Sequence, residues 1–294
     1  MKKLVGLSLG LYFVCSLAAA FAQESSGKVT PPPKVLVIMR EFLKPGRQGS
    51  THEKSESAFV RAMNDAKWPT RYFAADALSG RPRSLFFVRY DSFEAWEKDN
   101  MAMMRNPTLF AAMDQASLAD GDLLTDYDTN IVTYREDLSL RAAVDIAHMR
   151  YFEISRFVVR PGHYQEWEAL AKEYKAALEK ADPTAHWAMF ESMYGADNGG
   201  VFVIITPLKS LTETDRSLAD SKTVMAGIGE QEMKKLEGME ASCIESFQTN
   251  LFMFNPRMSY PPDEWVKADP DFWSSKMTTA NADVNDAKEI ETAR

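Results

Sequence analysis

The stretch EFLKPG at residues 41–46 returns as FVVRPG at residues 157–162, and YDTN at residues 127–130 returns as FQTN at residues 247–250. The motifs occur in the same order in both places and at a nearly constant spacing. Ordered motifs that recur at one long spacing indicate an internal duplication. The sequence therefore predicts two copies of one structural unit.

Each copy has the same order of predicted elements: strand, helix, strand, strand, helix, strand. In the second copy, branched and aromatic residues over 151–159 predict a strand, and an apolar stripe over 164–178 predicts a helix. Strands over 186–193 and 201–205 follow, joined by a glycine-rich turn. One long helical region over 210–236 and a last strand, which ends near Phe254, complete the unit.

The order β-α-β-β-α-β is the ferredoxin-like plan, in which two helices cover one face of a four-stranded sheet. The other face needs an apolar partner, and the second copy can provide it. The sequence thus predicts an α+β protein in which two ferredoxin-like repeats, residues 34–140 and 149–260, pack face to face across a linker at residues 141–148.

The strand that ends in Pro-Gly before a helix, followed by an aromatic-rich second strand, resembles NIPSNAP-type and antibiotic-biosynthesis-monooxygenase-type domains of the dimeric α/β-barrel superfamily. The resemblance covers residues 34–260 and implies an intrachain dimeric α/β barrel, a pseudo-dimer within one chain. That superfamily includes cofactor-free monooxygenases, haem-degrading enzymes, lactone isomerases and proteins of unknown role, so it implies no single reaction. No family active-site motif is recognised, and no catalytic residue is carried over.

The N-terminus has the plan of a secretory signal peptide: two lysines, an apolar run, and Ala20-Phe21-Ala22 before a polar segment. We expect cleavage after residue 22 and export to the periplasm or beyond the cell. Residues 23–33 end in three prolines and predict an extended spacer. The C-terminal tail, residues 261–294, contains Trp265 and Trp273, and we expect it to dock on the barrel before becoming disordered.

The formal charge of −8 becomes −10 once Lys2 and Lys3 are removed with the signal peptide. This balance argues against nucleic acid or an anionic membrane as a partner. After the signal peptide, no apolar run approaches the roughly 18 residues that a membrane span needs. Cys243 is then the only cysteine, so no intrachain disulfide is available.

Arg40 and Arg156 occupy matching strand positions in the two copies, as do the acids Asp76 and Glu191. Charged side chains within apolar strands need partners. Three interpretations stay open. One is a repeated arginine–carboxylate pair or network that stabilises the sheet. Another is a pair of pseudo-symmetric sites that bind an anion or carboxylate with the forked guanidinium group. The third is simple exposure of these side chains to solvent.

His52 and Glu56 lie four residues apart on the first helix, and His52 matches Trp167, which belongs to the apolar stripe of the second copy. A histidine in place of a core aromatic could act as a general base or an axial ligand in one half only. The alternative is a solvated histidine in the first turn, beside Glu53 and Glu56.

The other aromatic candidates open the second strand of each copy. Trp187 matches Tyr72, and His186 directly precedes Trp187. These side chains either pack in the core or line a pocket where a ligand would stack against Trp187 or Tyr72. Asn130 and Asn250, at matching positions in the last strands, either donate to a ligand or satisfy a neighbouring backbone group, and we favour the structural role.

The sequence shows no metal-ligand spacing, no phosphate-binding glycine loop and no serine or cysteine nucleophile motif. No cofactor is indicated, and haem is considered only because the superfamily includes haem-degrading enzymes. Three hypotheses follow: an exported protein that binds a small molecule, a cofactor-independent monooxygenase-like or haem-handling enzyme that uses His52 or His186, and a structural or protein-interaction module. Whether the protein is an enzyme stays open at this point.

Overall fold

The computed structural model describes residues 29–196 and 199–274. Its strands are β1 (Val35–Leu43), β2 (Tyr72–Ala77), β3 (Arg83–Tyr90), β4 (Leu124–Tyr134), β5 (Tyr151–Val159), β6 (Ala188–Tyr194), β7 (Val201–Leu208) and β8 (Ile244–Tyr260). Its helices are α1 (Ser50–Asp65), α2 (Phe93–Met104), α3 (Pro107–Gly121), α4 (Tyr164–Ala181), α5 (Thr212–Ile228), α6 (Glu230–Cys243), α7 (Asp263–Ala268) and α8 (Pro270–Trp273), with 3₁₀ turns at Glu136–Leu138 and Ile146–His148.

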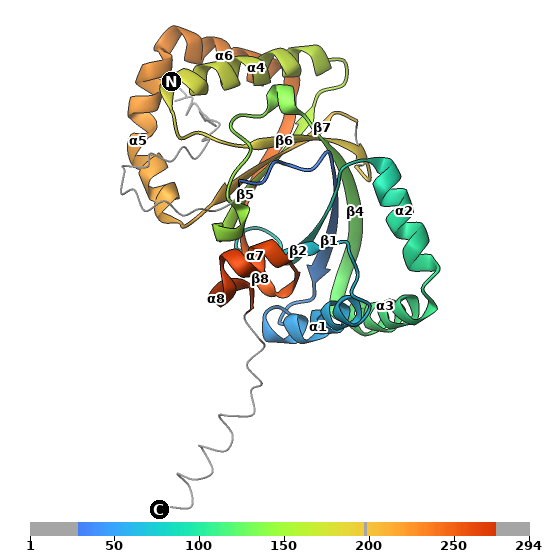
Figure 1. The fold of residues 1–294 in the computed structure, drawn as a ribbon. Helices are drawn as coiled ribbons and strands as arrows, with labels where there is room; N and C mark the ends of the chain where they lie inside the picture. The colour runs from blue at the N-terminus through green and yellow to red at the C-terminus, as the bar shows by residue number, and fades with distance from the viewer. Residues whose placement is uncertain (1–28, 197–198, 275–294) are drawn as a thin grey trace, which may run out of the picture.

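The strands form one closed barrel in the order β1-β3-β2-β8-β5-β7-β6-β4, and every neighbouring pair is antiparallel. The strands from the first half of the chain are contiguous, as are those from the second half, and the two sets join where β2 meets β8 and where β4 meets β6. Figure 1 shows α4, α5 and α6 over one side of the barrel and α1, α2 and α3 over the other. The fold is therefore a mixed α/β barrel, in agreement with the predicted α+β class.

Alternation along the strands separates the barrel interior from the outer faces that the helices cover. On β1, Leu36 and Ile38 point inward and belong to a cluster that contains side chains from both halves, including Phe152 and Phe254. The outer faces form two further clusters, one with α1 and α3 and the other with α4, α5 and α6. The interior of the barrel is thus a packed core shared by both halves.

The long helical region predicted near the end of each half is two helices in the structure. Between α2 and α3, the Asn106 side chain caps the new helix by accepting from the Leu109 N–H, and Pro107 occupies its first turn. Proline is tolerated there because the N–H it lacks has no partner within the helix. Between α5 and α6, Gly229 adopts a φ of 93°, which ends the first helix.

The recurring Thr-Asn motifs meet hairpin glycines of the opposite half. Gly195, which follows β6, packs so closely on β4 that a Cβ there would lie 2.0 Å from the Thr129 carbonyl oxygen. Gly80, which follows β2, packs on β8, where a Cβ would lie 2.4 Å from Asn250 Oδ1. Asn130 and Asn250 are both buried. Their place at the two seams between the halves explains their recurrence by structure alone.

Both ends of the described chain lie against the barrel. Thr30 N–H donates to the Val144 carbonyl at 2.8 Å, and Arg89 donates to the Pro31 carbonyl at 2.8 Å. The three prolines at residues 31–33 therefore cover one end of the barrel, where they line an apolar cavity of about 80 Å³.

The C-terminal helices cover the same region of the molecule. Trp265 and Trp273 join the interior cluster, and the Trp273 indole donates to the Ala147 carbonyl at 2.8 Å. The predicted signal peptide at residues 1–22 and the tail after residue 274 lie outside the described residues.

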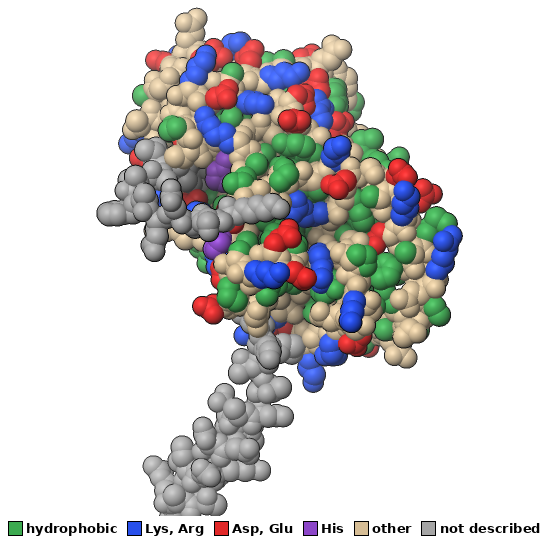
Figure 2. All heavy atoms as spheres, in the orientation of Figure 1, with side chains coloured by type: hydrophobic (Ala, Val, Ile, Leu, Met, Phe, Trp, Pro, Cys, Tyr) green, Lys and Arg blue, Asp and Glu red, His purple; other side chains and the backbone are tan. Residues whose placement is uncertain are grey.

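On the face shown in Figure 2, lysine and arginine side chains are interspersed with aspartate and glutamate, and apolar side chains gather over α2 and α3. Phe93, Met104, Phe110 and Leu118 are among the exposed apolar residues of these two helices. Within the described ranges, none of the helices has the length and hydropathy that crossing a bilayer requires.

Candidate metal centre

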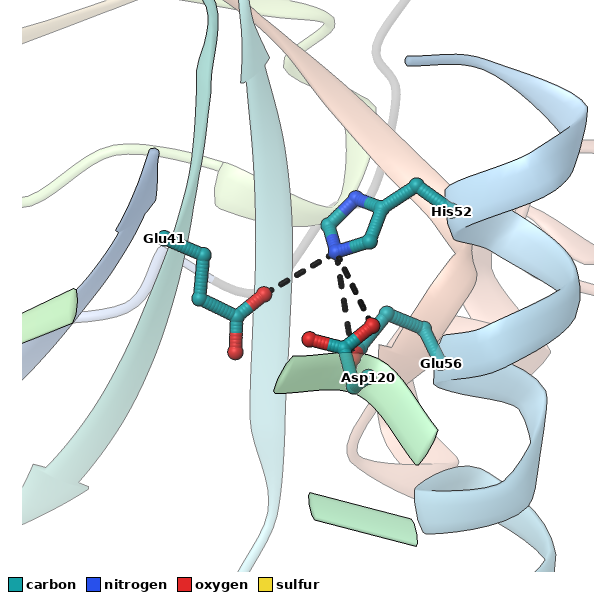
Figure 3. Close-up of side chains that lie close together, drawn as sticks. All are labelled: Glu41, His52, Glu56 and Asp120. Carbon is teal, nitrogen blue, oxygen red and sulfur yellow. Dashed lines mark hydrogen bonds and ion pairs between the residues drawn. The ribbon is translucent and has the colours of Figure 1, made fainter. Parts of the chain in front are cut away.

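Four ionisable side chains meet between the outer face of the first half's sheet and the helices that cover it (Figure 3). Glu41 shares the outer face of β1 with Val37 and Met39. His52 and Glu56 lie one turn apart on α1 and point toward that face, and Asp120 comes from the last turn of α3. The packing of α1 and α3 side by side on the sheet brings the four together.

The four side chains converge on one point. His52 Nε2 lies 3.0 Å from Glu41 Oε2, 3.6 Å from Asp120 Oδ1 and 3.9 Å from Glu56 Oε1. One nitrogen or oxygen atom from each residue lies within 4.8 Å of the corresponding atom of every other. Ligands of a single metal ion are at most about 4 Å apart, because each lies about 2 Å from the ion, and the three distances from His52 Nε2 are within this limit.

The cluster is sealed from solvent, and two of its oxygens have no hydrogen bond. His52 is 1% exposed, Asp120 2%, Glu56 3% and Glu41 8%. Glu56 Oε1 and Asp120 Oδ1 are buried and accept no hydrogen bond from any described residue. A buried carboxylate oxygen without a partner is costly, so these two atoms indicate that something else belongs beside them.

A hydrogen-bond relay determines which ring nitrogen of His52 carries the hydrogen in the neutral imidazole. Ser84 Oγ donates to Asp76 Oδ1 at 2.5 Å and lies 3.3 Å from His52 Nδ1. A hydroxyl has one hydrogen, so His52 Nδ1 must be the donor toward Ser84. In the neutral imidazole, Nε2 then carries a lone pair that points at three carboxylates. That arrangement is repulsive unless a proton or a cation lies between them.

The relay continues into the second half of the chain through β8. Asn255 donates to Asp76 Oδ2 at 2.7 Å and to Glu53 Oε1 at 3.1 Å, and Arg257 donates to Glu53 Oε2 at 3.0 Å. β8 supplies these groups because it extends to Tyr260, beyond the predicted end near Phe254, along β2. The surroundings of the cluster are therefore built by both halves.

The electrostatics of the cluster favour protons when no cation is present. Burial raises the pKa of Glu56 well above its usual value, and the charges of Glu41 and Asp120 raise it further. Burial likewise raises the pKa of Glu41 and of Asp120. For His52, burial opposes the charged imidazole, but its hydrogen bond to Glu41 and the nearby carboxylates outweigh this, and the pKa is raised.

The corresponding region of the second half is apolar. Phe157 on β5 pairs with Phe202 on β7, as Glu41 on β1 pairs with Ser84 on β3. Trp167 of α4 packs against both phenylalanines, with ring centroids 5.1 Å and 5.2 Å away. An equivalent sheet-and-helix layer is thus closed by aromatic rings. The polar cluster is therefore not a requirement of this layer, which supports a functional role for it.

The predicted recurring charges do not form the arginine–carboxylate pairs that their spacing suggested. Arg40 faces the barrel interior and binds Asp128 of β4 through two hydrogen bonds, one of them 2.8 Å long. Asp76 lies on the outer face of β2, with Ser84 and Asn255. Residues on opposite faces of a sheet cannot pair, so an Arg40–Asp76 pair is excluded.

The second half shows the same separation. Arg156 shares the inward face of β5 with Phe152, whereas Glu191 is on the outer face of β6. Glu191 accepts from Arg135 and from the Tyr164 hydroxyl, each at 2.9 Å. A carboxylate network does exist there, but its arginine is Arg135 and not the recurring one.

The structure separates the remaining candidates. His52 is fully buried, so its interpretation as a solvated first-turn residue is wrong. Both ring nitrogens of His186 contact backbone carbonyls, at 2.9 and 3.0 Å, which indicates a structural role. Trp187 is core, with its indole donating to the Leu138 carbonyl. Tyr72 is also buried in the core, but its hydroxyl has no hydrogen bond to a described residue.

Sequence reasoning named His52 and its neighbour Glu56 but predicted no metal site, and it missed Glu41 and Asp120 altogether. Glu41 lies directly after Arg40, which was a candidate because it matches Arg156 in the second copy. The usable signal was the mismatch between the copies: Glu41 and Ser84 match two phenylalanines, as His52 matches a tryptophan. Asp120 had no such signal, because the helical regions do not align well enough to identify its counterpart.

No family model matches this chain, and no curated protein matches it. Among solved structures, the chain is similar to a "Putative monooxygenase" from Fusobacterium nucleatum subsp. nucleatum, with 10% sequence identity, a TM-score of 0.49 and coverage of 76% of this chain and 94% of that one. The chain is also similar to an anthrone oxidase-like protein, with 12% sequence identity, a TM-score of 0.49 and coverage of 76% of this chain and 92% of that one. A third similar structure is a mutant chlorite dismutase from Candidatus Nitrospira defluvii, with 11% sequence identity, a TM-score of 0.46 and coverage of 80% of this chain and 96% of that one. Identities and scores at this level assign neither a reaction nor a ligand to this chain.

Proposed function

We propose that this protein binds one divalent transition-metal ion through Glu41, His52, Glu56 and Asp120. The observation that carries the proposal is the convergence on the Nε2 atom of His52 of two buried carboxylate oxygens that accept no hydrogen bond, Glu56 Oε1 and Asp120 Oδ1. A cation at this point would satisfy both oxygens and accept the imidazole lone pair at once.

Charge supports the same proposal. Three ionised carboxylates and a neutral imidazole sum to a charge of −3 in a buried chamber, which is unfavourable without a counter-ion. A divalent ion reduces that charge to −1. Its binding would also displace the protons that the raised pKa values of Glu41, Glu56 and Asp120 otherwise hold there.

The donor set points to a class of metal. Three carboxylates suit hard ions such as Mn²⁺, while one imidazole favours Mn²⁺, Fe²⁺ or Zn²⁺ over Mg²⁺ and Ca²⁺. No thiolate or thioether is among the four donors, which disfavours Cu⁺ and iron–sulfur clusters. We therefore expect Mn²⁺, Fe²⁺ or Zn²⁺ to bind more tightly than Mg²⁺.

The test is a titration of the EDTA-treated protein with Mn²⁺, Zn²⁺ and Mg²⁺ in separate calorimetric experiments. The expected result is one site per chain for Mn²⁺ and Zn²⁺ and weaker binding of Mg²⁺. Glu56→Gln and Asp120→Asn should each weaken binding strongly, and the control Asp114→Asn, an exposed residue of the same helix as Asp120, should not. Equal binding by all three variants would refute the assignment.

Binding of a small apolar molecule is a second candidate function. The cavity beneath residues 31–33 supports it, because its lining includes Phe73, Phe87 and Phe152, and Arg89 is its only charged lining residue within the described chain. At about 80 Å³, this cavity would admit a group of only a few carbon atoms. A retained ligand in native mass spectrometry, lost when a bulky side chain replaces Ala188 in the lining, would support this function.

The haem-handling alternative has weaker support. An axial histidine needs an open approach to its ring nitrogen, yet His52 Nε2 is enclosed by three carboxylates, and both nitrogens of His186 contact carbonyls. A monooxygenase-like reaction stays compatible with the proposed metal site. An absorption spectrum of the purified protein without a haem band would agree with this assessment, and a haem band would contradict it.

We also propose that the barrel is a tandem fusion of two ferredoxin-like units, related to NIPSNAP-type or antibiotic-biosynthesis-monooxygenase-type domains, and that the mature protein is exported. The equivalent strand pairings of Glu41 and Phe157 support the fusion. The charge and apolar pattern of residues 1–22 supports export. Intact mass of the protein recovered from its own host tests cleavage after Ala22.

A further inference from the structure

A second pocket adjoins the apolar cavity beneath residues 31–33. The cavity, of about 80 Å³, lies at the end of the barrel and is called the inner cavity here. The second pocket, of about 310 Å³, lies between the ends of β2 and β3 and helix α7, and is called the outer pocket. Pro33, Phe73 and Arg89 line both spaces, so the two meet at these three side chains.

The inner cavity and the outer pocket differ in chemistry. Phenylalanine, proline and aliphatic side chains form most of the inner lining, and Arg89 is the one charged residue among the described residues there. The outer pocket contains further charged residues, Arg71 and Asp91. A ligand that contacts both spaces therefore needs an apolar part and a charged or polar part.

The guanidinium of Arg89 keeps donors for such a ligand. Arg89 is half-buried and lies on the inward face of β3, two residues after Phe87. Its Nη2 atom donates to the Pro31 carbonyl at 2.8 Å, and this is its one hydrogen bond to the described chain. Since a guanidinium presents several N–H groups in a planar fork, the others can donate to an added acceptor.

A single negative charge suits this place. Arg71 is already paired with Asp263 at 3.0 Å, so Arg89 is the cation of the described lining that is left for a ligand. Burial lowers the pKa of Arg89, and the exposed acids Asp91 and Glu264 raise it. An anion on the guanidinium would replace the solvation lost on burial, whereas a dianion would place excess negative charge beside those acids.

The fold itself does not require an arginine at this position. Arg89 of β3 pairs with Leu36 of β1, as Pro207 of β7 pairs with Phe152 of β5. Arg89 and Pro207 both line the inner cavity, so the second half closes its side of the same cavity with an apolar ring. The cation is thus an addition in one half, which supports a role in binding.

Deepening the second candidate function, on which this inference rests, we propose that these two spaces bind a small monocarboxylate. Its apolar tail lies in the inner cavity, and its carboxylate accepts hydrogen bonds from Arg89 at the boundary with the outer pocket. Both oxygens of a carboxylate can accept from the fork of one guanidinium. The size of the inner cavity limits the tail to about four carbon atoms, which favours short-chain acids over long-chain ones.

The experiment is a calorimetric titration of the EDTA-treated full chain with pentanoate and, separately, with pentanol, pentylamine and acetate. Pentanoate should bind at one site per chain and more tightly than the other three, because the alcohol lacks the charge, the amine has the opposite charge and acetate lacks the tail. Arg89→Gln, which keeps a donor for the Pro31 carbonyl, should bind pentanoate about 10-fold more weakly and pentanol as the wild type does. Arg61→Gln, at an exposed arginine of α1 outside both spaces, is the control and should bind pentanoate like the wild type.

The inference and the function on which it rests fail in different ways. If pentanol binds as tightly as pentanoate, or if Arg89→Gln matches the wild type, the carboxylate assignment is overturned while binding of an apolar molecule stands. If neither pentanoate nor pentanol binds, both are refuted. Because the protein is free of metal in these titrations, no outcome bears on the metal centre.

A second variant tests the position of the tail. Ala188→Leu places a larger side chain in the inner cavity and should abolish binding of pentanoate, with circular dichroism used to show that the variant folds. Unchanged binding in the folded variant would show that the tail does not lie in the inner cavity. If the variant does not fold, the comparison of the four ligands on the wild-type protein still decides the inference.

Discussion

Glu41 of β1 and Phe157 of β5 hold the same position in strands of equal length, yet one faces polar side chains and the other aromatic rings. Glu41 pairs with Ser84 and Tyr127 on its two neighbouring strands, and Phe157 pairs with Phe202 and Phe247. One barrel therefore contains a charged and an apolar version of the same layer. The apolar layer shows that aromatic side chains are sufficient for packing at these positions. The polar groups of the charged layer are therefore not needed for packing.

This relationship predicts the effect of transferring the aromatic set into the first half. The variant Glu41→Phe, His52→Trp, Glu56→Ala, Ser84→Phe, Asp120→Ala should fold, because the first four changes copy a packing that the other half already uses and the fifth removes the buried carboxylate that would lose its partner. Removing unpaired buried carboxylates should leave the metal-free protein as stable as the wild type or more stable, by about 1–3 kcal/mol. Urea unfolding monitored by circular dichroism measures this. Failure to fold would contradict the transfer of the aromatic packing, and Mn²⁺ binding that persists would argue against a metal centre at these residues.

The pH dependence of the metal-free protein should have a definite sign. Burial raises the pKa of Glu56 in the folded state above 4.5, and the pKa of His52 is raised above 6.5. The folded state then holds more protons than the unfolded state, so the stability contributed by these groups is complete below pH 4.5 and is lost as pH rises through the folded pKa values. Urea midpoints should fall between pH 5 and pH 8 in EDTA.

Metal binding should reverse that slope. The ligands must lose protons to bind a cation, so affinity for Mn²⁺ should rise over the same pH range. Glu56→Gln should flatten the pH dependence of the metal-free protein, because the amide does not titrate. A metal-free protein that becomes more stable toward pH 8 would contradict the protonation described here.

The Ser84 hydroxyl should affect the affinity for metal, although Ser84 is not one of the four proposed ligands. It accepts from His52 Nδ1 and donates to Asp76, and so keeps Nε2 free to bind metal. Ser84→Ala should weaken Mn²⁺ binding by about 10- to 100-fold, the usual effect of losing an outer partner of a ligating histidine. Ser57→Ala on α1, which removes local hydrogen bonds to the Lys54 carbonyl and from Arg61, is the control. A shift in the imidazole ¹⁵N resonances of His52 would report the changed tautomer independently of affinity.

Gly195 should be sensitive to substitution for a reason that concerns barrel closure. It has a φ of 85°, and a Cβ would lie 2.0 Å from the Thr129 carbonyl oxygen, across the seam between β6 and β4. Gly195→Ala should cost both the backbone strain, about 1–2 kcal/mol, and a displacement of that seam. Gly46→Ala is the matched control, because its φ is 77° but nothing lies within 4 Å. Equal losses of unfolding free energy in the two variants would show that the seam is not tight.

Much of the fold could be predicted because it depends on local patterns. The first strand of each half has the bounds that its apolar run indicates, Val35–Leu43 and Tyr151–Val159, and α4 begins at Tyr164 as the stripe predicts. The sequence predicts one helix in each of the later helical regions and the structure has two, although Asn106-Pro107 and Gly229 are ordinary helix boundary signals. The extension of β8 to Tyr260 depends on pairing with β2, which no local pattern reveals.

The site was only partly predictable, because it depends on which strand face and which helix turn meet in three dimensions. His52 was identified through its mismatch with Trp167, and Asp76 through its match with Glu191. The roles of these two residues were not predicted, since Asp76 accepts a hydrogen bond from Ser84 and does not pair with an arginine. Asp120 lies on a different helix from His52, and only the packing of α1 against α3 brings them to 3.6 Å.

The most direct test of the metal centre is pulsed electron paramagnetic resonance of the Mn²⁺-loaded protein, with electron spin echo modulation used to count bound imidazole nitrogens. The arrangement of Glu41, His52, Glu56 and Asp120 predicts modulation from a single ¹⁴N of one imidazole, which disappears when His52→Gln is loaded with the same ion. Modulation that is absent in the wild type, or unchanged in His52→Gln, would show that Mn²⁺ does not bind at this cluster.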